Sequence, residues 1–392
     1  MSLRKKAKNT YLPNKVKLLN GGTEYFSALT GLIDSAVVSM HLQTYIFSDD
    51  DTGRMVAEHL AAAAKRGVKV FLLADGYASQ RLSRETIILL RDAGVHFRLF
   101  EPIFKSTKFY VGRRLHHKVA VADGRYALVG GVNIADRYND FPDIPAWKDV
   151  AVLIEGPAAY ETEGICCEMW NAGIVSTKTK PGPLPDFELK QGRDEYICQL
   201  RVRRNDWVKN KNQIARSYSQ IFKEVNDSLT IMCSYFLPGR RLRSQMKKAA
   251  RRGVEIKVIV SGLSDVALAK PAERYFYGEM LKNKIKLYEY NKNVLHAKVA
   301  VADGSQMTIG SYNLNNISAY ASIELNVDII SESFVSMVQE RFDDIIANDC
   351  TEITPNFYAR NINLFKLFIY WASFQLVRAM IFLFTFYFRR EE

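Results

Sequence analysis

The chain has 392 residues, of which 48% are hydrophobic and 24% are charged. This composition is typical of a folded globular protein and excludes a largely disordered one. With 54 Lys and Arg against 42 Asp and Glu, the formal net charge is +12, which favours anionic partners such as phospholipid or nucleic acid. The five cysteines show no metal-binding spacing and make a poor disulfide framework.

The amino-terminal segment, MSLRKKAKNTYLPNK, is basic and lacks an apolar core, so the sequence predicts no signal peptide. Further along, a long alanine-rich stretch with helical character leads into the apolar run VKVFLLADG. Helix and strand patterns of this kind alternate in both halves of the chain, which predicts an α/β fold. His41, His59 and His96 have no chemical partners at suggestive spacings, and we predict structural roles for them.

The first distinctive motif starts at residue 116 and reads H-x-K-x4-D-x6-G-G-x-N. Its polar members are His116, Lys118, Asp123 and Asn133. Apolar, partly β-branched runs flank its Asp-Gly pair, which is typical of a β-hairpin. Alternate residues of a strand face the same side, so His116 and Lys118 project together. The neighbouring His117 faces the other side and is expected to pack in the interior.

Three prolines within residues 176–194 interrupt any helical pattern and predict a junction there. We therefore expect a first lobe over residues 1–180, a linker over 181–194 and a second lobe over 195–360. The second lobe repeats the motif with every matched position 180 residues later (296 against 116, 313 against 133). The members of this second copy are His296, Lys298, Asp303 and Asn313.

A motif duplicated with unchanged spacing predicts two half-sites that meet to form one site. One neutral imidazole can act as a nucleophile towards phosphorus, while the second protonates the leaving alkoxide and later deprotonates the incoming alcohol or water. Two ammonium groups and the amides of Asn133 and Asn313 can hold the phosphate oxygens. These residue types suit phosphodiester chemistry, and because the lysines supply positive charge they require no metal or other cofactor.

A nucleophilic imidazole also needs a partner, usually a carboxylate, that fixes its tautomer. Each half offers a candidate downstream of its Asn: Asp149 within WKDV and Glu324 within SIELN. We predict that these two carboxylates orient the histidines. Asp123 and Asp303 lie in the predicted hairpin turns, where an aspartate is expected to shape the loop.

The doubled H-x-K-x4-D motif with its G-(G/S)-x-N tail resembles the phospholipase D superfamily. The segments WKDVAVLIEGPA and SIELNV are similar to that family's sequences, as are the openings of the two halves, which begin TYIFSDDD and SYFLPGRR. The resemblance covers roughly residues 15–345 and points to the bacterial cardiolipin synthase-like branch, because both motifs are intact and the first has Gly-Gly. It implies two pseudo-symmetric phospholipase D-like lobes, each a mixed β-sheet flanked by helices.

The resemblance also implies a covalent phosphohistidine intermediate, formed on one histidine while the other acts as acid and base. We expect His116 to be the nucleophile. The catalytic residues that the resemblance implies are His116, Lys118, Asp123, His296, Lys298 and Asp303.

The carboxyl-terminal stretch 362–388 reads INLFKLFIYWASFQLVRAMIFLFTFYF. It is long enough to span a bilayer, but Arg378 near its middle opposes spanning, and its polar residues fall on one arc of a helical wheel. We therefore predict an apolar helix over residues 361–392 that lies in the membrane interface. Docking on the protein itself or on a partner subunit, and spanning, are the alternatives.

These features predict a membrane-associated, cardiolipin synthase-like phosphatidyltransferase that acts on phosphatidylglycerol at the cytoplasmic side of the cell membrane, as a peripheral or monotopic protein. Its partners would be the anionic phospholipid substrate and the membrane surface, which the C-terminal helix contacts. A phospholipase D hydrolase of phospholipids uses the same chemistry with water as acceptor. A nuclease or phosphodiesterase of the same superfamily, with nucleic acid as partner, is the other alternative. The intact motifs disfavour a non-enzymatic lipid-binding scaffold.

Overall fold

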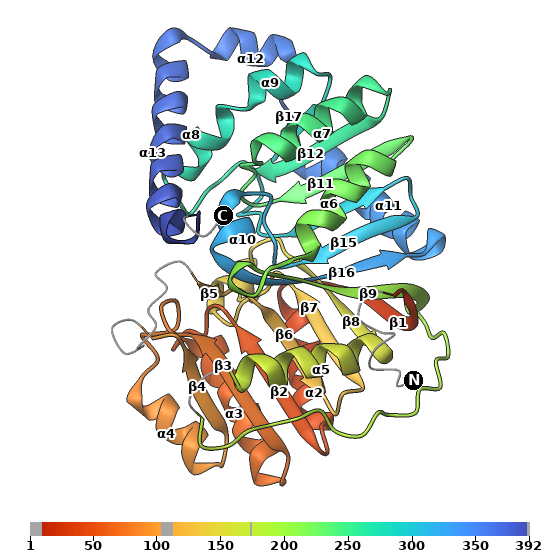
Figure 1. Ribbon diagram of the computed structural model, residues 1–392, viewed down its shortest axis with the longest axis vertical. Helices are drawn as coiled ribbons and strands as arrows, with labels where there is room; N and C mark the ends of the chain where they lie inside the picture. Colours follow the sequence, from red (N-terminus) through yellow and green to blue (C-terminus); the bar gives the residue numbers. More distant parts are fainter. Residues whose placement is uncertain (1–9, 103–112, 173–174, 390–392) are drawn as a thin grey trace.

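The computed structural model describes residues 10–102, 113–172 and 175–389. Two lobes lie one above the other in Figure 1, the first in red to yellow and the second in green to blue. Each lobe contains a mixed β-sheet with helices packed against it, which agrees with the predicted α/β class. Between the lobes, residues 175–195 contain neither helix nor strand.

The sheet of the first lobe has the order β4-β3-β2-β6-β7-β8-β1. Its strands are β1 (Leu12–Asn20), β2 (Ser39–Thr44), β3 (Lys69–Asp75), β4 (His96–Phe100), β6 (Lys118–Ala122), β7 (Tyr126–Gly130) and β8 (Val150–Glu155). Strands β2, β3 and β4 are parallel and the remaining pairs are antiparallel. The hairpin predicted around Asp123 is confirmed as β6–β7.

The second sheet repeats this order as β13-β12-β11-β14-β15-β16-β9. Its strands are β9 (Tyr196–Asp206), β11 (Ser228–Cys233), β12 (Glu255–Ser261), β13 (Lys286–Tyr290), β14 (Lys298–Ala302), β15 (Gln306–Gly310) and β16 (Ser322–Ile330). The short strands β5 (Arg114–Leu115), β10 (Lys211–Asn212) and β17 (Cys350–Glu352) pair with β16, β9 and β13. Because β1 also pairs with β9, the two sheets are joined edge to edge by two equivalent strands.

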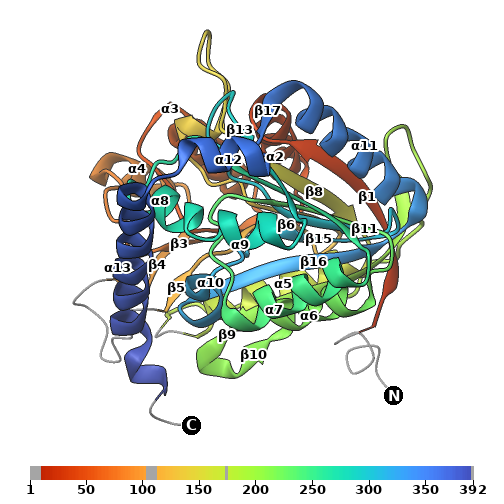
Figure 2. The ribbon, with the colours of Figure 1, turned by 90° about the horizontal axis from the view of Figure 1, so that it is seen from above.

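Helices cover the sheets in matching places along the two halves (Figures 1 and 2). The first lobe has α2 (Thr23–Ser35), α3 (Asp51–Lys65), α4 (Arg84–Asp92), the short η1 (Asp136–Tyr138) and α5 (Pro157–Trp170). The second has η2 (Trp207–Lys209), α6 (Gln213–Glu224), α7 (Arg240–Arg251), α8 (Ala269–Arg274), α9 (Tyr277–Lys282), α10 (Asn316–Tyr320) and α11 (Glu332–Asp349). The chain continues into α12 (Pro355–Asn361) and α13 (Leu364–Arg389).

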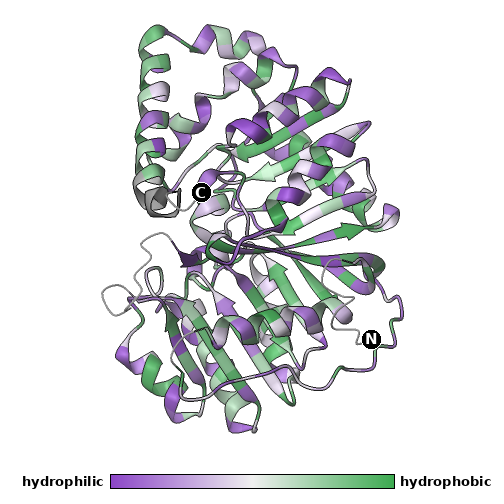
Figure 3. Ribbon diagram, in the orientation of Figure 1, coloured by the Kyte–Doolittle hydropathy of each residue, from purple (hydrophilic) through white to green (hydrophobic). Residues whose placement is uncertain are grey.

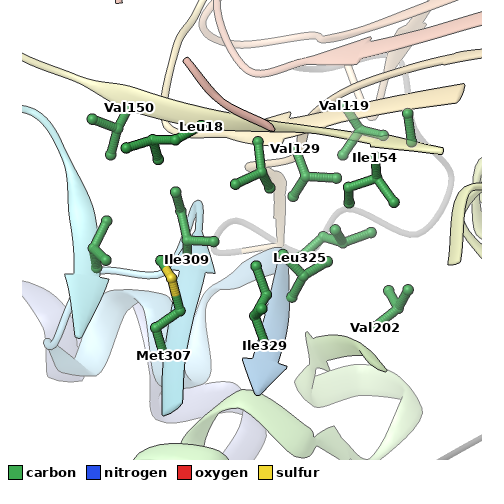
Figure 4. Close-up of a cluster of buried hydrophobic side chains, with 14 of the residues drawn as sticks. Leu18, Val119, Val129, Val150, Ile154, Val202, Met307, Ile309, Leu325 and Ile329 are labelled. Atoms are coloured by element: carbon green, nitrogen blue, oxygen red, sulfur yellow. The ribbon is translucent and has the colours of Figure 1, made fainter. Parts of the chain in front are cut away.

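The core explains why the strand KVAVA occurs in both lobes. In β6, Val119 and Val121 face the cluster between the two sheets, whereas Ala120 and Ala122 face the outer helices. Strand β14 repeats this division. Figure 4 shows the central cluster, in which Leu18 and Val129 of the first lobe face Ile309 and Leu325 of the second. A strand buried on both faces reads as a continuous apolar run, and these runs fix the two motif histidines at the end of a rigid core.

The histidines outside the motif have structural contacts, as predicted. His41 is buried and stacks on Phe71 at 4.9 Å between ring centroids, and His96 also stacks on Phe71 at 4.9 Å. His59 lies 2.8 Å from the carboxylate of Asp34. His117 is fully buried and its Nδ1 lies 3.0 Å from the amide oxygen of Gln43, which confirms its interior position.

The C-terminal segment forms α13, which docks along one side of the second lobe (Figure 2). Phe374 stacks on Tyr275 and meets Phe276 edge-on, both at 4.9 Å, and Ser373 and Val377 are buried. Of the alternatives for this helix, docking on the protein's own surface is thus observed. Within the described part of the chain, no helix combines the length and apolarity needed to cross a bilayer.

Apolar residues lie on both sides of α13. Phe374 and Val377 pack against the lobe, and Lys366 and Tyr370 line a cavity with Arg274. Large apolar side chains also remain on the outward side, where Phe365 is 71% exposed and Phe368 is 61% exposed. Figure 3 shows the hydrophobic colour along this helix. The helix therefore packs through apolar residues and still leaves apolar surface exposed.

The burial of His41 predicts a pH dependence of stability. Burial lowers the pKa of His41 to about 4, while the same group in the unfolded chain titrates near 6.5. Because the folded protein binds this proton more weakly than the unfolded chain, the free energy of unfolding decreases as the pH falls from 6.5 towards 4, by up to about 1.4 kcal/mol per pH unit. The variant His41→Phe keeps an aromatic ring on Phe71 but cannot titrate, so we expect its free energy of unfolding to depend less on pH over this range. Urea titrations at pH 7.5, 6 and 5 measure the difference, and parallel curves for the two proteins would contradict it.

Candidate active site

The two motif histidines line a single cavity. His116 and His296 both face a space of about 880 Å³ whose walls come from both lobes, and Asn133 and Asn313 line it as well. A volume of this size lies at the upper end of the range for ligand pockets. Folding therefore joins the two copies of the motif into one site.

Short backbone bridges across the lobe boundary position the histidines. Strand β5 runs parallel to the start of β16, and the N–H of His116 donates to the carbonyl of Ile323 at 2.9 Å. On the other side, the N–H of His296 donates to the carbonyl of Lys148 at 2.7 Å. The segment before each histidine thus pairs with the segment of the other lobe that carries the carboxylate.

The carboxylates are exchanged between the lobes. Nδ1 of His116, in the first lobe, donates to Oε2 of Glu324 in the second at 2.8 Å. Nδ1 of His296, in the second lobe, donates to Oδ2 of Asp149 in the first at 2.7 Å. With Nδ1–H held in this way, the lone pair of each ring lies on Nε2.

The small residues of each motif fit the carboxylate beside them. A Cβ at Gly131 would overlap the carboxylate of Asp149, so this position has no room for a side chain. Its counterpart, Ser311, instead donates its hydroxyl to Glu324 at 2.5 Å. The Gly-Gly and Gly-Ser forms of the motif therefore fit the carboxylate beside each of them, Asp149 in the first copy and Glu324 in the second.

The two motif lysines lie behind the histidines and are not among the residues that line the cavity. Lys118 is buried, and its ammonium donates to the carbonyl of His116 at 2.9 Å and lies 5.2 Å from the ring centre of Tyr45. Lys298 is also buried, donates to the carbonyl of His296, and lies 3.0 Å from Nδ1 of that ring. Burial lowers the pKa of both ammonium groups, while the carboxylates around them act in the opposite direction.

The two asparagines lie in the cavity wall with their amide oxygens engaged. Oδ1 of Asn133 accepts from the N–H of Ile46 at 3.2 Å, and Oδ1 of Asn313 accepts from the hydroxyl of Ser234 at 2.7 Å. Because the two amide oxygens accept these bonds, the NH2 groups are the part of each amide that can donate to a ligand.

Asp123 and Asp303 are outside the cavity, at the far ends of β6 and β14. The Asp123 carboxylate accepts three backbone N–H groups, the shortest from Val38 at 2.7 Å, and Asp303 makes the same three bonds at 2.9 to 3.0 Å. Both residues have a positive φ, of 54° and 49°. The resemblance assigns them to catalysis, but these contacts correct that assignment, because the carboxylates hold the turns that start β2 and β11.

The electrostatics around the two rings favour their neutral forms. Burial, together with the charge of Lys298, lowers the pKa of His296 to about 3 against the opposing effect of Asp149. Burial also lowers the pKa of His116, although Glu324 raises it. For Asp149 burial acts upward, but its hydrogen bond and charge interaction with His296 outweigh burial and its pKa is lowered.

Several aromatic residues around the histidines were not predicted from the sequence. Tyr45 lies edge-on to His116 at 4.9 Å, while Tyr138 and Trp147 lie 5.1 and 6.1 Å from His296. A signal existed for Tyr45, because TYIF corresponds to SYFL in the second half and both tyrosines line the cavity. Tyr138, at the end of η1, had no sequence signal, and Trp147 was noted only as part of the WKDV segment.

One wall of the cavity is apolar and comes partly from α13. Val377 and Met380 of this helix line it beside Val266, Leu268 and Ile317. Among the described residues, no cluster of three or more His, Cys, Asp or Glu side chains could hold a metal ion. The site thus combines a polar floor of imidazole and amide groups with a wall suited to hydrocarbon.

Known proteins resemble this chain over most of its length. Residues 29–161 and 218–346 match the family described as "Cardiolipin synthase, PLD-like domain". Cardiolipin synthase B of Escherichia coli O6:H1 is 33% identical over 343 residues, which cover 87% of this chain and 82% of the relative. A probable cardiolipin synthase of Bacillus subtilis is 27% identical, over 92% of this chain and 72% of the relative.

Among solved structures, the phosphatidylserine synthase of Haemophilus influenzae is similar with a TM-score of 0.70 at 14% identity, covering 96% of this chain and 95% of that one. The polyphosphate kinase of Porphyromonas gingivalis has a TM-score of 0.59 at 14% identity, covering 87% of this chain and 49% of that one. At these identities the likeness concerns the fold alone. Together with the matched family, it shows that the chain belongs to the phospholipase D superfamily, as an enzyme of the cardiolipin synthase-like branch.

Proposed function

We propose that the protein is a membrane-associated phosphatidyltransferase that makes cardiolipin from phosphatidylglycerol through a covalent phosphohistidine intermediate. The observation that carries this proposal is that His116 and His296 share one cavity while each is held by a carboxylate of the opposite lobe. Two imidazoles with free Nε2 atoms suit a double displacement at phosphorus. The names of the relatives support phospholipid as the substrate class.

In the first step, Nε2 of His116 attacks the phosphorus of one phosphatidylglycerol, and the bond from phosphorus to the headgroup glycerol oxygen breaks. His296, protonated at Nε2, gives its proton to that oxygen, so glycerol leaves as a neutral alcohol. In the second step, a hydroxyl of another phosphatidylglycerol loses its proton to His296 and attacks the phosphorus. The phosphorus–nitrogen bond breaks, cardiolipin leaves, and both histidines return to their starting states.

Substrate binding favours the protonated form of His296, which takes its proton from water. Burial and the charge of Lys298 hold the pKa of this ring at about 3. A phosphodiester brings one negative charge next to the ring, and an adjacent opposite charge raises the pKa of an imidazole. Meanwhile, Glu324 stabilises the positive charge that forms on His116 during attack, and the NH2 groups of Asn133 and Asn313 are suited to hold the non-bridging oxygens.

The outward apolar face of α13 supports membrane association. Phe365, Phe368 and Trp371 are exposed on it, and the same helix reaches the cavity through Val377 and Met380. A helix that presents aromatic and aliphatic residues on one face binds at the lipid headgroup boundary. Docked there, the cavity mouth would lie beside the surface from which a diacyl substrate comes.

The first prediction concerns the two histidines. Purified enzyme with phosphatidylglycerol vesicles and no added metal should form cardiolipin and glycerol, and His116→Ala or His296→Ala should each lower the rate by about 10²-fold or more. His59→Ala, which changes a surface histidine, serves as the matched control and should keep the wild-type rate. Single-stranded DNA is incubated in parallel, and its degradation without any lipid product would favour the nuclease alternative.

The second prediction concerns the carboxylate exchange. Glu324→Gln keeps the side-chain volume but loses the charge that fixes the His116 tautomer, so kcat should fall by about 10²- to 10⁴-fold. The melting temperature reports whether the fold persists. Wild-type turnover in this variant would remove Glu324 from the mechanism.

The third prediction concerns the membrane. The double variant Phe365→Ser/Phe368→Ser removes exposed apolar surface without touching Phe374, so sedimentation with anionic liposomes should decrease several-fold. Val37, 75% exposed at the opposite end of β2 from the cavity, gives the matched control Val37→Ser. Unchanged liposome binding of the double variant would rule out α13 as the contact surface.

A further inference from the structure

Arg137 is a cation at the cavity that the mechanism above does not use. It lines the cavity and is exposed, and its guanidinium lies 5.4 Å from the ring centre of Tyr138 and 5.0 Å from that of Trp147. Among the described residues, no carboxylate lies within ion-pairing distance of it. Arg114, the other arginine of the lining, lies 3.6 Å from Asp75 instead.

The position of Arg137 is tied to His296. Tyr138 and Trp147, the two rings that hold the guanidinium, are also the rings that flank the His296 imidazole. The backbone N–H of Trp147 donates to the carbonyl of Arg137 at 2.9 Å, and this bond joins the two ends of the loop between these residues. The guanidinium and the imidazole therefore contact the same two rings, and both groups line the same cavity.

The His296 side of the cavity is where the alcohol is expected. In the proposed mechanism, His296 gives its proton to the departing glycerol and takes one from the incoming hydroxyl, so both alcohols contact this ring. A departing glycerol is neutral. An incoming phosphatidylglycerol is not, because its own phosphate is joined to the reacting hydroxyl through a glycerol bridge of three carbons.

We propose that Arg137 binds the phosphate of the acceptor lipid and so selects an anionic phospholipid over water or a neutral alcohol as the second substrate. This inference rests on the proposed function. Arginine suits the task because its planar fork binds phosphate oxygens in pairs and stays charged when stacked on aromatic rings. Asp265, the carboxylate of the cavity lining, accepts from the hydroxyl of Tyr235, and no described carboxylate lies within ion-pairing distance of Arg137, so the guanidinium is left to an anionic ligand.

A competition experiment tests the acceptor site. Wild-type enzyme and Arg137→Gln are given phosphatidylglycerol vesicles with ethanol present, and cardiolipin and phosphatidylethanol are measured in the same reaction. Both products pass through the same intermediate, so their ratio does not depend on how much of the enzyme is folded. We expect Arg137→Gln to lower the cardiolipin to phosphatidylethanol ratio by about tenfold or more. Arg137→Lys, which keeps the charge without the fork, should give an intermediate ratio.

The control is Arg216→Gln, which removes the same charge from an exposed position of α6 away from the cavity and should keep the wild-type ratio. An unchanged ratio in Arg137→Gln, with both products reduced alike or neither reduced, would overturn the acceptor site and leave the proposed function intact. A wild-type enzyme that forms phosphatidylethanol but no cardiolipin would overturn the synthase function itself.

Discussion

The exchange of carboxylates between the lobes is the constraint on which the site depends. His116 is held by Glu324 and His296 by Asp149, and each pair joins residues on opposite sides of the boundary. Neither lobe alone supplies the carboxylate that contacts its own motif histidine. The backbone bridges at Ile323 and Lys148 make the exchange rigid, because they fix the segments that carry the carboxylates. This geometry gives a physical reason for a duplicated motif in one polypeptide: each half completes the other.

Groups of both signs lie close to the two histidines. The carboxylates of Asp149 and Glu324 act against the burial that lowers the pKa of Lys118 and Lys298, and burial also lowers the pKa of both imidazoles. An isolated buried charge is costly, so such opposite partners are expected. Under the proposed mechanism, the phosphodiester adds one negative charge beside His296, which favours a proton on that ring. Substrate binding and the activation of the acid would then be one electrostatic event.

The C-terminal helix links this polar centre to the outside. Phe374 and Val377 pack on the second lobe, Met380 extends into the cavity wall, and Phe365 and Phe368 remain exposed. A helix that docked only for stability would be expected to leave few large apolar side chains exposed. The exposed ones place hydrophobic surface on the helix that also lines the cavity, an arrangement that suits a hydrophobic substrate arriving from a membrane.

The sequence by itself determined the α/β class, both β-hairpins, the interior position of His117 and the membership of the two motifs in a single family. These follow from local patterns, because alternation, turn chemistry and repeated spacing are properties of short segments. It also supplied the right carboxylates, Asp149 and Glu324, but not their pairing. Only the tertiary structure decided that the pairs cross the lobe boundary, that Asp123 and Asp303 hold turns outside the cavity, and that Arg137 shares its aromatic neighbours with His296. These features depend on contacts between segments far apart in the chain. A short sequence pattern does not determine which distant segments will lie side by side.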